Sequence, residues 1–162
     1  MAKGYLALVL HAHLPFIRHP EHESFLEENW LFEAITDTYI PLINVFERLV
    51  NDGVDFRITV SLSPTLICML KDELLVSRYL KYLDKMIRLA DMEIERTHGD
   101  EKINKLAIMY SERFKNARYV FSEKYGNDLT PAFKKFQDLG KVEVITCCAT
   151  HGFLPLMDLY KP

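Results

Sequence analysis

Residues 5–15 read Tyr-Leu-Ala-Leu-Val-Leu-His-Ala-His-Leu-Pro, an apolar run that ends in two histidines and a proline. The apolar run, residues 5–10, predicts a buried strand. Parallel α/β folds gather their chemistry where strands end, so His11 and His13, in the loop expected after it, are candidate site residues. The stretch therefore predicts an α/β fold and marks one edge of its sheet.

The other end of the chain repeats this arrangement. Residues 142–148, Val-Glu-Val-Ile-Thr-Cys-Cys, predict a strand that runs into residues 149–155, Ala-Thr-His-Gly-Phe-Leu-Pro. Because parallel strands end at the same edge of a sheet, His151 is expected to converge with His11 and His13.

Helical patterns fill the chain between these strands. Ser24 and Glu27 have capping-box spacing, which predicts a helix from about Phe25 that Pro41 kinks or breaks. Residues 55–62 alternate as a second strand, and Ser63-Pro64 is a helix start signal. Further helical patterns cover residues 71–96, 101–125 and 130–139. This order predicts one domain, residues 1–162, with parallel strands and a long helical insertion after strand two.

Composition excludes several classes of partner. The 162 residues are 49% hydrophobic and 27% charged, which is typical of one globular domain. A net charge of -3 without a Lys/Arg cluster argues against nucleic acid or an anionic membrane as partner. The apolar runs are too short to span a bilayer, and the expected compartment is the cytoplasm.

The cysteines and the acidic residues both have plain interpretations. Cys68, Cys147 and Cys148 are odd in number and form no CxxC motif, so they are predicted to be reduced, inert core residues. Four glutamates lie close to the first helix start, where the helix dipole favours negative charge. Solvated capping is the predicted role of this set, Glu21, Glu23, Glu27 and Glu28.

The histidines and Trp30 keep several readings open from the residues alone. His11 and His13 could be paired metal ligands of a barrel hydrolase with His151 as a further ligand, or could bind substrate, or could make structural polar contacts. The sequence offers no further ligands at a convincing spacing, and no carboxylates at a spacing that would orient the histidines on a metal. Trp30, on an amphipathic helix, is either a core residue or a platform for a sugar ring.

Four segments together resemble glycoside hydrolase family 57, and within it the 1,4-α-glucan branching enzymes. They occur in the family's order along the whole chain: residues 4–16, residues 18–20, the Trp-Leu-Phe-Glu-Ala run at 30–34, and residues 149–156. The resemblance implies an incomplete (β/α) barrel of seven strands, with a helical insertion after strand two. A chain that stops soon after strand three is then expected to be the N-terminal part of that barrel and to need the remainder of it as a partner.

The resemblance also implies an activity. Family members act on α-glucans by a retaining mechanism, with a glutamate nucleophile and an aspartate acid/base, and both are expected beyond Pro162. No residue here is assigned a catalytic role, and neither a cofactor nor a metal is expected. His11, His13 and His151 are expected to bind sugar hydroxyls, and Trp30 to stack on a glucose ring.

Four other functions remain as alternatives. An α-amylase or a 4-α-glucanotransferase of the same family would share these segments, because the acceptor is chosen by parts of the protein outside them. A metal-dependent barrel hydrolase and a noncatalytic carbohydrate-binding fragment belong to other classes. The fragment alone is expected to be inactive.

Overall fold

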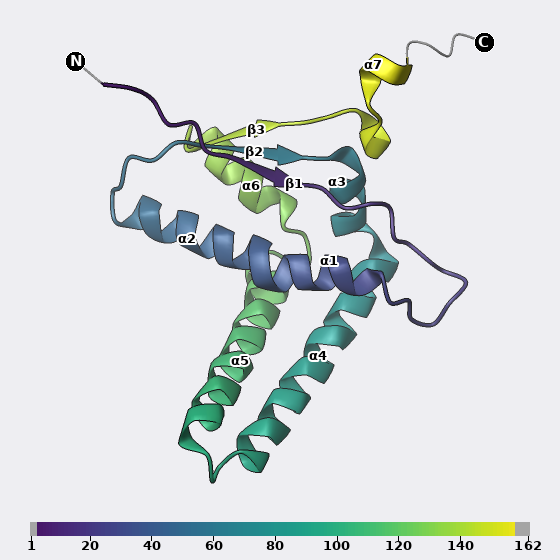
Figure 1. Cartoon of the computed structure of the whole chain (residues 1–162), viewed down its shortest axis with the longest axis vertical. Coiled ribbons are helices and arrows are strands. Elements are labelled where there is room, and N and C mark those ends of the chain that lie inside the picture. Colours follow the sequence, from purple (N-terminus) through teal and green to yellow (C-terminus); the bar gives the residue numbers. More distant parts are fainter. Residues whose placement is uncertain (1–2, 158–162) are drawn as a thin grey trace.

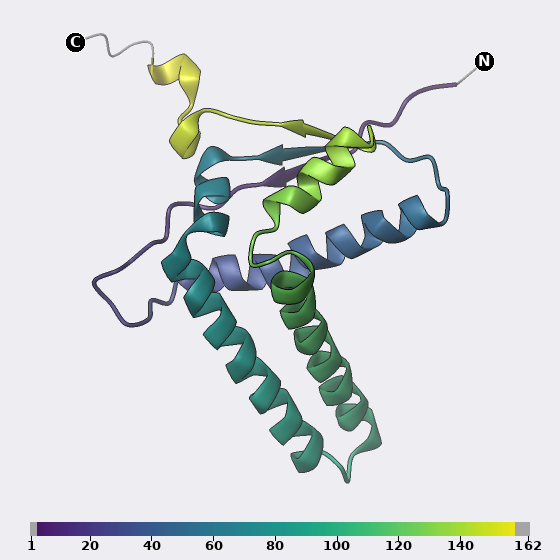
Figure 2. The same cartoon turned by 180° about the vertical axis from the view of Figure 1, so that it is seen from behind.

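A three-stranded parallel sheet organises residues 3–157, the part of the chain that the computed structural model describes. The strands are β1 (Val9–Ala12), β2 (Ile58–Leu62) and β3 (Val142–Ile145), in the spatial order β1-β2-β3. Helices lie along one side of this sheet, and a helical hairpin projects away from it (Figures 1 and 2). The predicted parallel α/β class is confirmed. Three strands do not test the seven-stranded barrel, which stays a prediction.

The two faces of the sheet differ in what covers them. Side chains alternate between the faces of a strand, and Ala12, Val60 and Val142 are buried in the core on the helix side. On the other face Val9 and Ile145 stay exposed, at 55% and 40%. The site therefore opens on a sheet face that the described helices leave uncovered.

All three strands are shorter than the sequence predicted, and β2 begins at Ile58 rather than at residue 55. β1 begins at Val9 rather than at Tyr5, because its ladder with β2 starts at the Val9↔Thr59 pair, and Tyr5 is 99% exposed. His11 therefore lies inside the strand, opposite Ser61, instead of in the loop after it. β3 ends at Ile145 rather than at residue 148.

The first helix differs from its prediction in where it begins and in its course at Pro41. α1 (Glu28–Ala34) begins three residues late and has no side-chain cap, because Phe25 packs on the His19 ring, 3.8 Å between centroids. Pro41 does not break the helix. α1 continues through a π-helical turn, η1 (Ile35–Tyr39), into α2 (Ile40–Asn51), and the three segments form one helical rod.

The remaining helices follow the predicted order. Ser63 caps α3 (Pro64–Lys71) by accepting from the Leu66 N–H, and Asp72 caps α4 (Glu73–Arg96) by accepting from Leu75. α4 and α5 form the projecting hairpin in Figure 1. No described helix is both long and apolar enough to cross a membrane. The other elements are α5 (Glu101–Tyr119), η2 (Val120–Lys124), α6 (Thr130–Asp138), η3 (Ala149–His151) and α7 (Leu154–Met157).

The loop after β1 is tied to α3 and α4 along its length. The Ile17 N–H donates to Met69 Sδ at 3.4 Å. Arg18 Nε donates to Asp72 Oδ2 at 2.7 Å, so the residue that caps α4 also anchors the loop. Because the loop is fixed at these points, the histidine that starts it has a defined position.

Candidate functional site

Three histidines meet at the carboxyl edge of the sheet. His11 lies in β1, His13 follows it, and His151 ends η3 after β3. The His13 and His151 rings stack, with centroids 3.9 Å apart and planes 25° apart. His11 lies 5.2 Å from His151 and 6.0 Å from His13, centroid to centroid. The structure thus brings together the three histidines that the strand ends predicted.

Side chains from neighbouring turns bind two of the rings. His13 Nδ1 lies 3.0 Å from the hydroxyl of Ser63, the cap of α3. His151 Nδ1 lies 3.2 Å from the Cys147 sulfur. The sequence identified Ser63 as a helix cap, but a contact across 50 residues left no local signal.

All three cysteines differ from their prediction as buried core thiols. Cys68 is exposed, whereas Cys147 and Cys148 are half-buried free thiols. Cys147 contacts an imidazole nitrogen, so it has the basic partner that the sequence around it did not reveal. The turn at residues 148–151 folds the ring back onto the sulfur, since the His151 N–H donates to the Cys148 carbonyl at 2.9 Å.

The backbone that carries His151 is strained. Thr150 and His151 both have left-handed backbone, with φ of 63° and 60°. This region is unfavourable for residues with a Cβ, and most of all for a β-branched residue such as Thr150. Residues with strained backbone are often found at functional sites, where contacts with the surrounding structure stabilise the strained conformation.

Electrostatics keep the centre of the cluster neutral. Burial lowers the pKa of His13, and the neighbouring His151 and His11 lower it further because they repel an added proton. A neutral imidazole has one N–H donor and one acceptor nitrogen, which suits hydrogen bonding to hydroxyl groups. Among residues 3–157, no group of three or more His, Cys, Asp or Glu side chains could hold a metal ion.

Trp30 is not part of this cluster. It lies on α1, 49% exposed, and makes no ring contact with the three histidines among the described residues. Its exposure is higher than a core residue has, and its role as a sugar platform stays a prediction.

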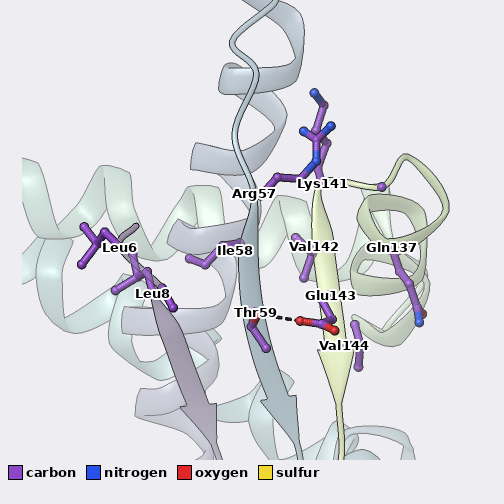
Figure 3. Close-up of a pocket in the computed structure, with 12 residues that line it drawn as sticks. Leu6, Leu8, Arg57, Ile58, Thr59, Gln137, Lys141, Val142, Glu143 and Val144 are labelled. Atoms are coloured by element: carbon purple, nitrogen blue, oxygen red, sulfur yellow. Dashed lines mark hydrogen bonds between the residues drawn. The ribbon is translucent and has the colours of Figure 1, made fainter. Parts of the chain in front are cut away.

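A carboxylate that the sequence analysis did not single out lies on the same sheet face, nearer the amino ends of the strands. Glu143 in β3 accepts a hydrogen bond from Thr59 Oγ1 in β2 at 2.8 Å (Figure 3). The two residues are paired in register, two positions before Ser61 and Ile145. Both line a hollow of about 530 Å³ together with Arg57 and Lys141. Figure 3 labels these four side chains among those that line it. The sequence signal that could have identified Glu143 is a single carboxylate within an otherwise apolar strand.

A family model and several curated proteins match most of this chain. A family model described as glycosyl hydrolase family 57 matches residues 7–161. Over 155 residues the chain is 38% identical to a 1,4-alpha-glucan branching enzyme of Thermococcus kodakarensis, covering 96% of this chain and 22% of that protein. It is 24% identical to a probable 1,4-alpha-glucan branching enzyme of Mycobacterium tuberculosis, covering 95% of this chain and 31% of that protein.

Solved structures of similar fold cover most of this chain. The alpha-amylase AmyC of Thermotoga maritima is 46% identical with a TM-score of 0.87, covering 95% of this chain and 29% of that one. A GH57-type branching enzyme of Pyrococcus horikoshii is 39% identical with a TM-score of 0.85, covering 96% of this chain and 29% of that one. The chain therefore spans less than a third of the length of each of these proteins.

Proposed function

This chain belongs to glycosyl hydrolase family 57, and on that premise we propose that it is the N-terminal part of a longer α-glucan-active enzyme that makes branches. The observation that carries the proposal is the convergence of His11, His13 and His151 at the carboxyl edge of the sheet. The relatives named as branching enzymes favour α-1,4 cleavage followed by transfer to a 6-hydroxyl.

In this proposal the three histidines bind sugar and do not perform the bond cleavage. Imidazole nitrogens donate to and accept from hydroxyl groups, and His11 and His151 are exposed enough to meet a ligand. The glutamate nucleophile and the aspartate acid/base of a retaining reaction lie outside residues 1–162. Family membership favours this glucan chemistry over the metal-dependent hydrolase interpretation of the same histidines.

A second candidate is an α-amylase of the same family. The structure of AmyC, at 46% identity, favours it. The two activities differ in the acceptor, which is water in hydrolysis and a glucose 6-hydroxyl in branching. A 4-α-glucanotransferase, which uses a 4-hydroxyl, is the third member of this set. In each case the substrate is an α-glucan such as amylose or glycogen, and the proposed compartment is the cytoplasm.

Product analysis separates these activities. The longer protein is incubated with amylose, and the product is then treated with a debranching enzyme that cuts only α-1,6 linkages. Release of short chains supports branching. Shortened linear glucans without new branches support the amylase, and linear chains both longer and shorter than the substrate support the glucanotransferase.

The role of the histidines is tested by a matched pair of variants. His151→Ala removes a ring of the cluster and is expected to lower kcat/KM on amylose at least about tenfold, since a bound sugar loses a hydrogen bond to an imidazole nitrogen. His98→Ala changes a histidine in the turn after α4 and is expected to leave kcat/KM unchanged. Equal kinetics for the two variants would contradict sugar binding by the cluster.

A further inference from the structure

His13 and His151 each direct Nδ1 at a side chain that carries its own polar proton. The partner of His13 is the Ser63 hydroxyl at 3.0 Å, and the partner of His151 is the Cys147 thiol at 3.2 Å. In a neutral imidazole only one nitrogen is protonated, and the partner of the other nitrogen decides which one it is. Ser63 and Cys147 are therefore in a position to set the tautomers of two adjacent rings.

At Ser63, the other contacts leave the hydroxyl proton for His13. The Ser63 oxygen already accepts from the Leu66 N–H at 3.3 Å in capping α3. Thr65 Oγ1 lies 3.2 Å away and can donate to the same oxygen. When Thr65 donates, both acceptor positions of Ser63 Oγ are used, and the Ser63 proton is directed at His13 Nδ1.

At Cys147, the chemistry of sulfur gives the same direction. A thiol sulfur is a weak acceptor, while an unprotonated imidazole nitrogen carries an exposed lone pair. The contact is therefore best satisfied with S–H donating to His151 Nδ1. The strained turn at Thr150 and His151 is what brings the ring back to the sulfur.

We propose that Ser63 and Cys147 are positioning residues that hold His13 and His151 as tautomers with the proton on Nε2. The pair then offers two Nε2–H donors, which select oxygen acceptors such as sugar hydroxyl or ring oxygens. This inference deepens the proposed function, on which its choice of ligand rests. The tautomers themselves do not depend on which glucan reaction the protein performs.

The stacking of the rings agrees with two neutral tautomers. Their centroids are 3.9 Å apart, a separation at which two protonated rings would repel each other strongly. Repulsion from His151 is one of the causes that lower the pKa of His13, after burial. An Nε2–H donor also cannot ligate a cation, so these tautomers direct the site toward oxygen-rich neutral ligands.

Neutron diffraction from deuterium-exchanged crystals of the longer protein reads the tautomers directly. The expected result is deuterium on Nε2 and none on Nδ1, in both His13 and His151. Deuterium on Nδ1 of either ring overturns the assignment for that ring, whatever the protein does to glucans.

Kinetics on maltoheptaose, a soluble linear α-glucan, provide the second measurement. Cys147→Ala removes the thiol donor and is expected to raise KM about three- to tenfold with a smaller effect on kcat, because a binding contact is lost. Cys147→Ser keeps a donor at this position and is expected to restore KM. Cys148→Ala, the matched control, is expected to match the unmodified protein.

The outcomes separate the two proposals. If Cys147→Ala and Cys148→Ala behave alike, or if Cys147→Ser fails to restore KM while folding normally, the positioning role of Cys147 is wrong. If the deuterium lies on Nε2 as expected but no α-glucan is bound or converted, the proposed function fails and the tautomer assignment stands.

Discussion

Arg78 on α4 forms an ion pair with Glu28 at the start of α1, and the Glu28 residue is only 1% exposed. The same guanidinium donates to the carbonyl oxygens of His19 and His22 in the loop after β1. One side chain thus joins the projecting hairpin, the first helix and the loop that begins at His13. Glu28 was predicted to be a solvated capping residue, and this prediction is wrong because α4 packs over the helix start.

Replacing Arg78 is expected to destabilise the protein strongly. Arg78→Ala leaves the Glu28 carboxylate buried without a partner, which typically costs about 3 to 5 kcal/mol. Arg96→Ala is the matched control, since it removes an exposed pair with Glu93 and is expected to change the free energy of unfolding far less. Denaturant unfolding of both variants measures the difference, and equal losses would contradict the structural role of the buried pair.

Arg113 is expected to compensate for the proline inside the first helical rod. Pro41 has no N–H to donate to the Asp37 carbonyl four residues earlier, and Arg113 Nη2 donates to this carbonyl at 3.3 Å. Arg113 also pairs with the Asp37 carboxylate at 2.9 Å. Arg113→Ala is therefore expected to cost about 1 kcal/mol.

A double-mutant cycle tests this compensation. In Pro41→Ala the backbone gains the missing donor, so the cost of Arg113→Ala is expected to be smaller in that background. Thermal or denaturant unfolding of the four proteins gives the coupling energy. Strict additivity would show that Arg113 does not act through the carbonyl that Pro41 leaves.

The lowered pKa of His13 predicts how stability depends on pH. The unfolded ring takes up a proton near its usual value of 6.5, while the folded ring does so only at lower pH. The folded state therefore binds fewer protons in this window, and the free energy of unfolding falls as pH drops from 6.5 to the folded pKa. Carboxylates such as Glu47 have a usual value of 4.5 and titrate below this range. Denaturant unfolding between pH 7 and 5 should show a slope that His13→Gln reduces, and an unchanged slope would contradict it.

Local patterns in the sequence predicted much of the framework. Apolar runs marked the strands, Ser63-Pro64 marked the start of α3, and the positive φ of Gly126 and Asn127 agrees with the predicted end of the helix before α6. The convergence of the three histidines also followed from a general rule, since parallel strands end at one edge.

The missed features depend on contacts between distant segments. Beside Pro41, Arg113 donates to the Asp37 carbonyl from 76 residues away, a contact that local sequence patterns do not encode. The burial of Glu28 needs Arg78, 50 residues away, and helix propensity does not encode it. Cys147 and His151 are close in sequence, yet their contact requires left-handed backbone at Thr150 and His151. Neither residue is a glycine or an asparagine, so the sequence did not indicate this conformation.

Expressed alone, residues 1–162 are expected to be inactive on glucans and only marginally stable. The sheet face opposite the helices exposes Val9 and Ile145 beside the polar Thr59–Glu143 pair, and a parallel sheet is normally covered on both faces. The catalytic carboxylates of the proposed reaction are expected beyond Pro162, and losing them typically removes several orders of magnitude of rate. The chain is therefore expected to aggregate or bind an apolar dye during size-exclusion chromatography and to release no sugar from amylose above background. A monodisperse monomer that converts amylose would show that the uncovered face is stable and that a catalytic group lies within these residues.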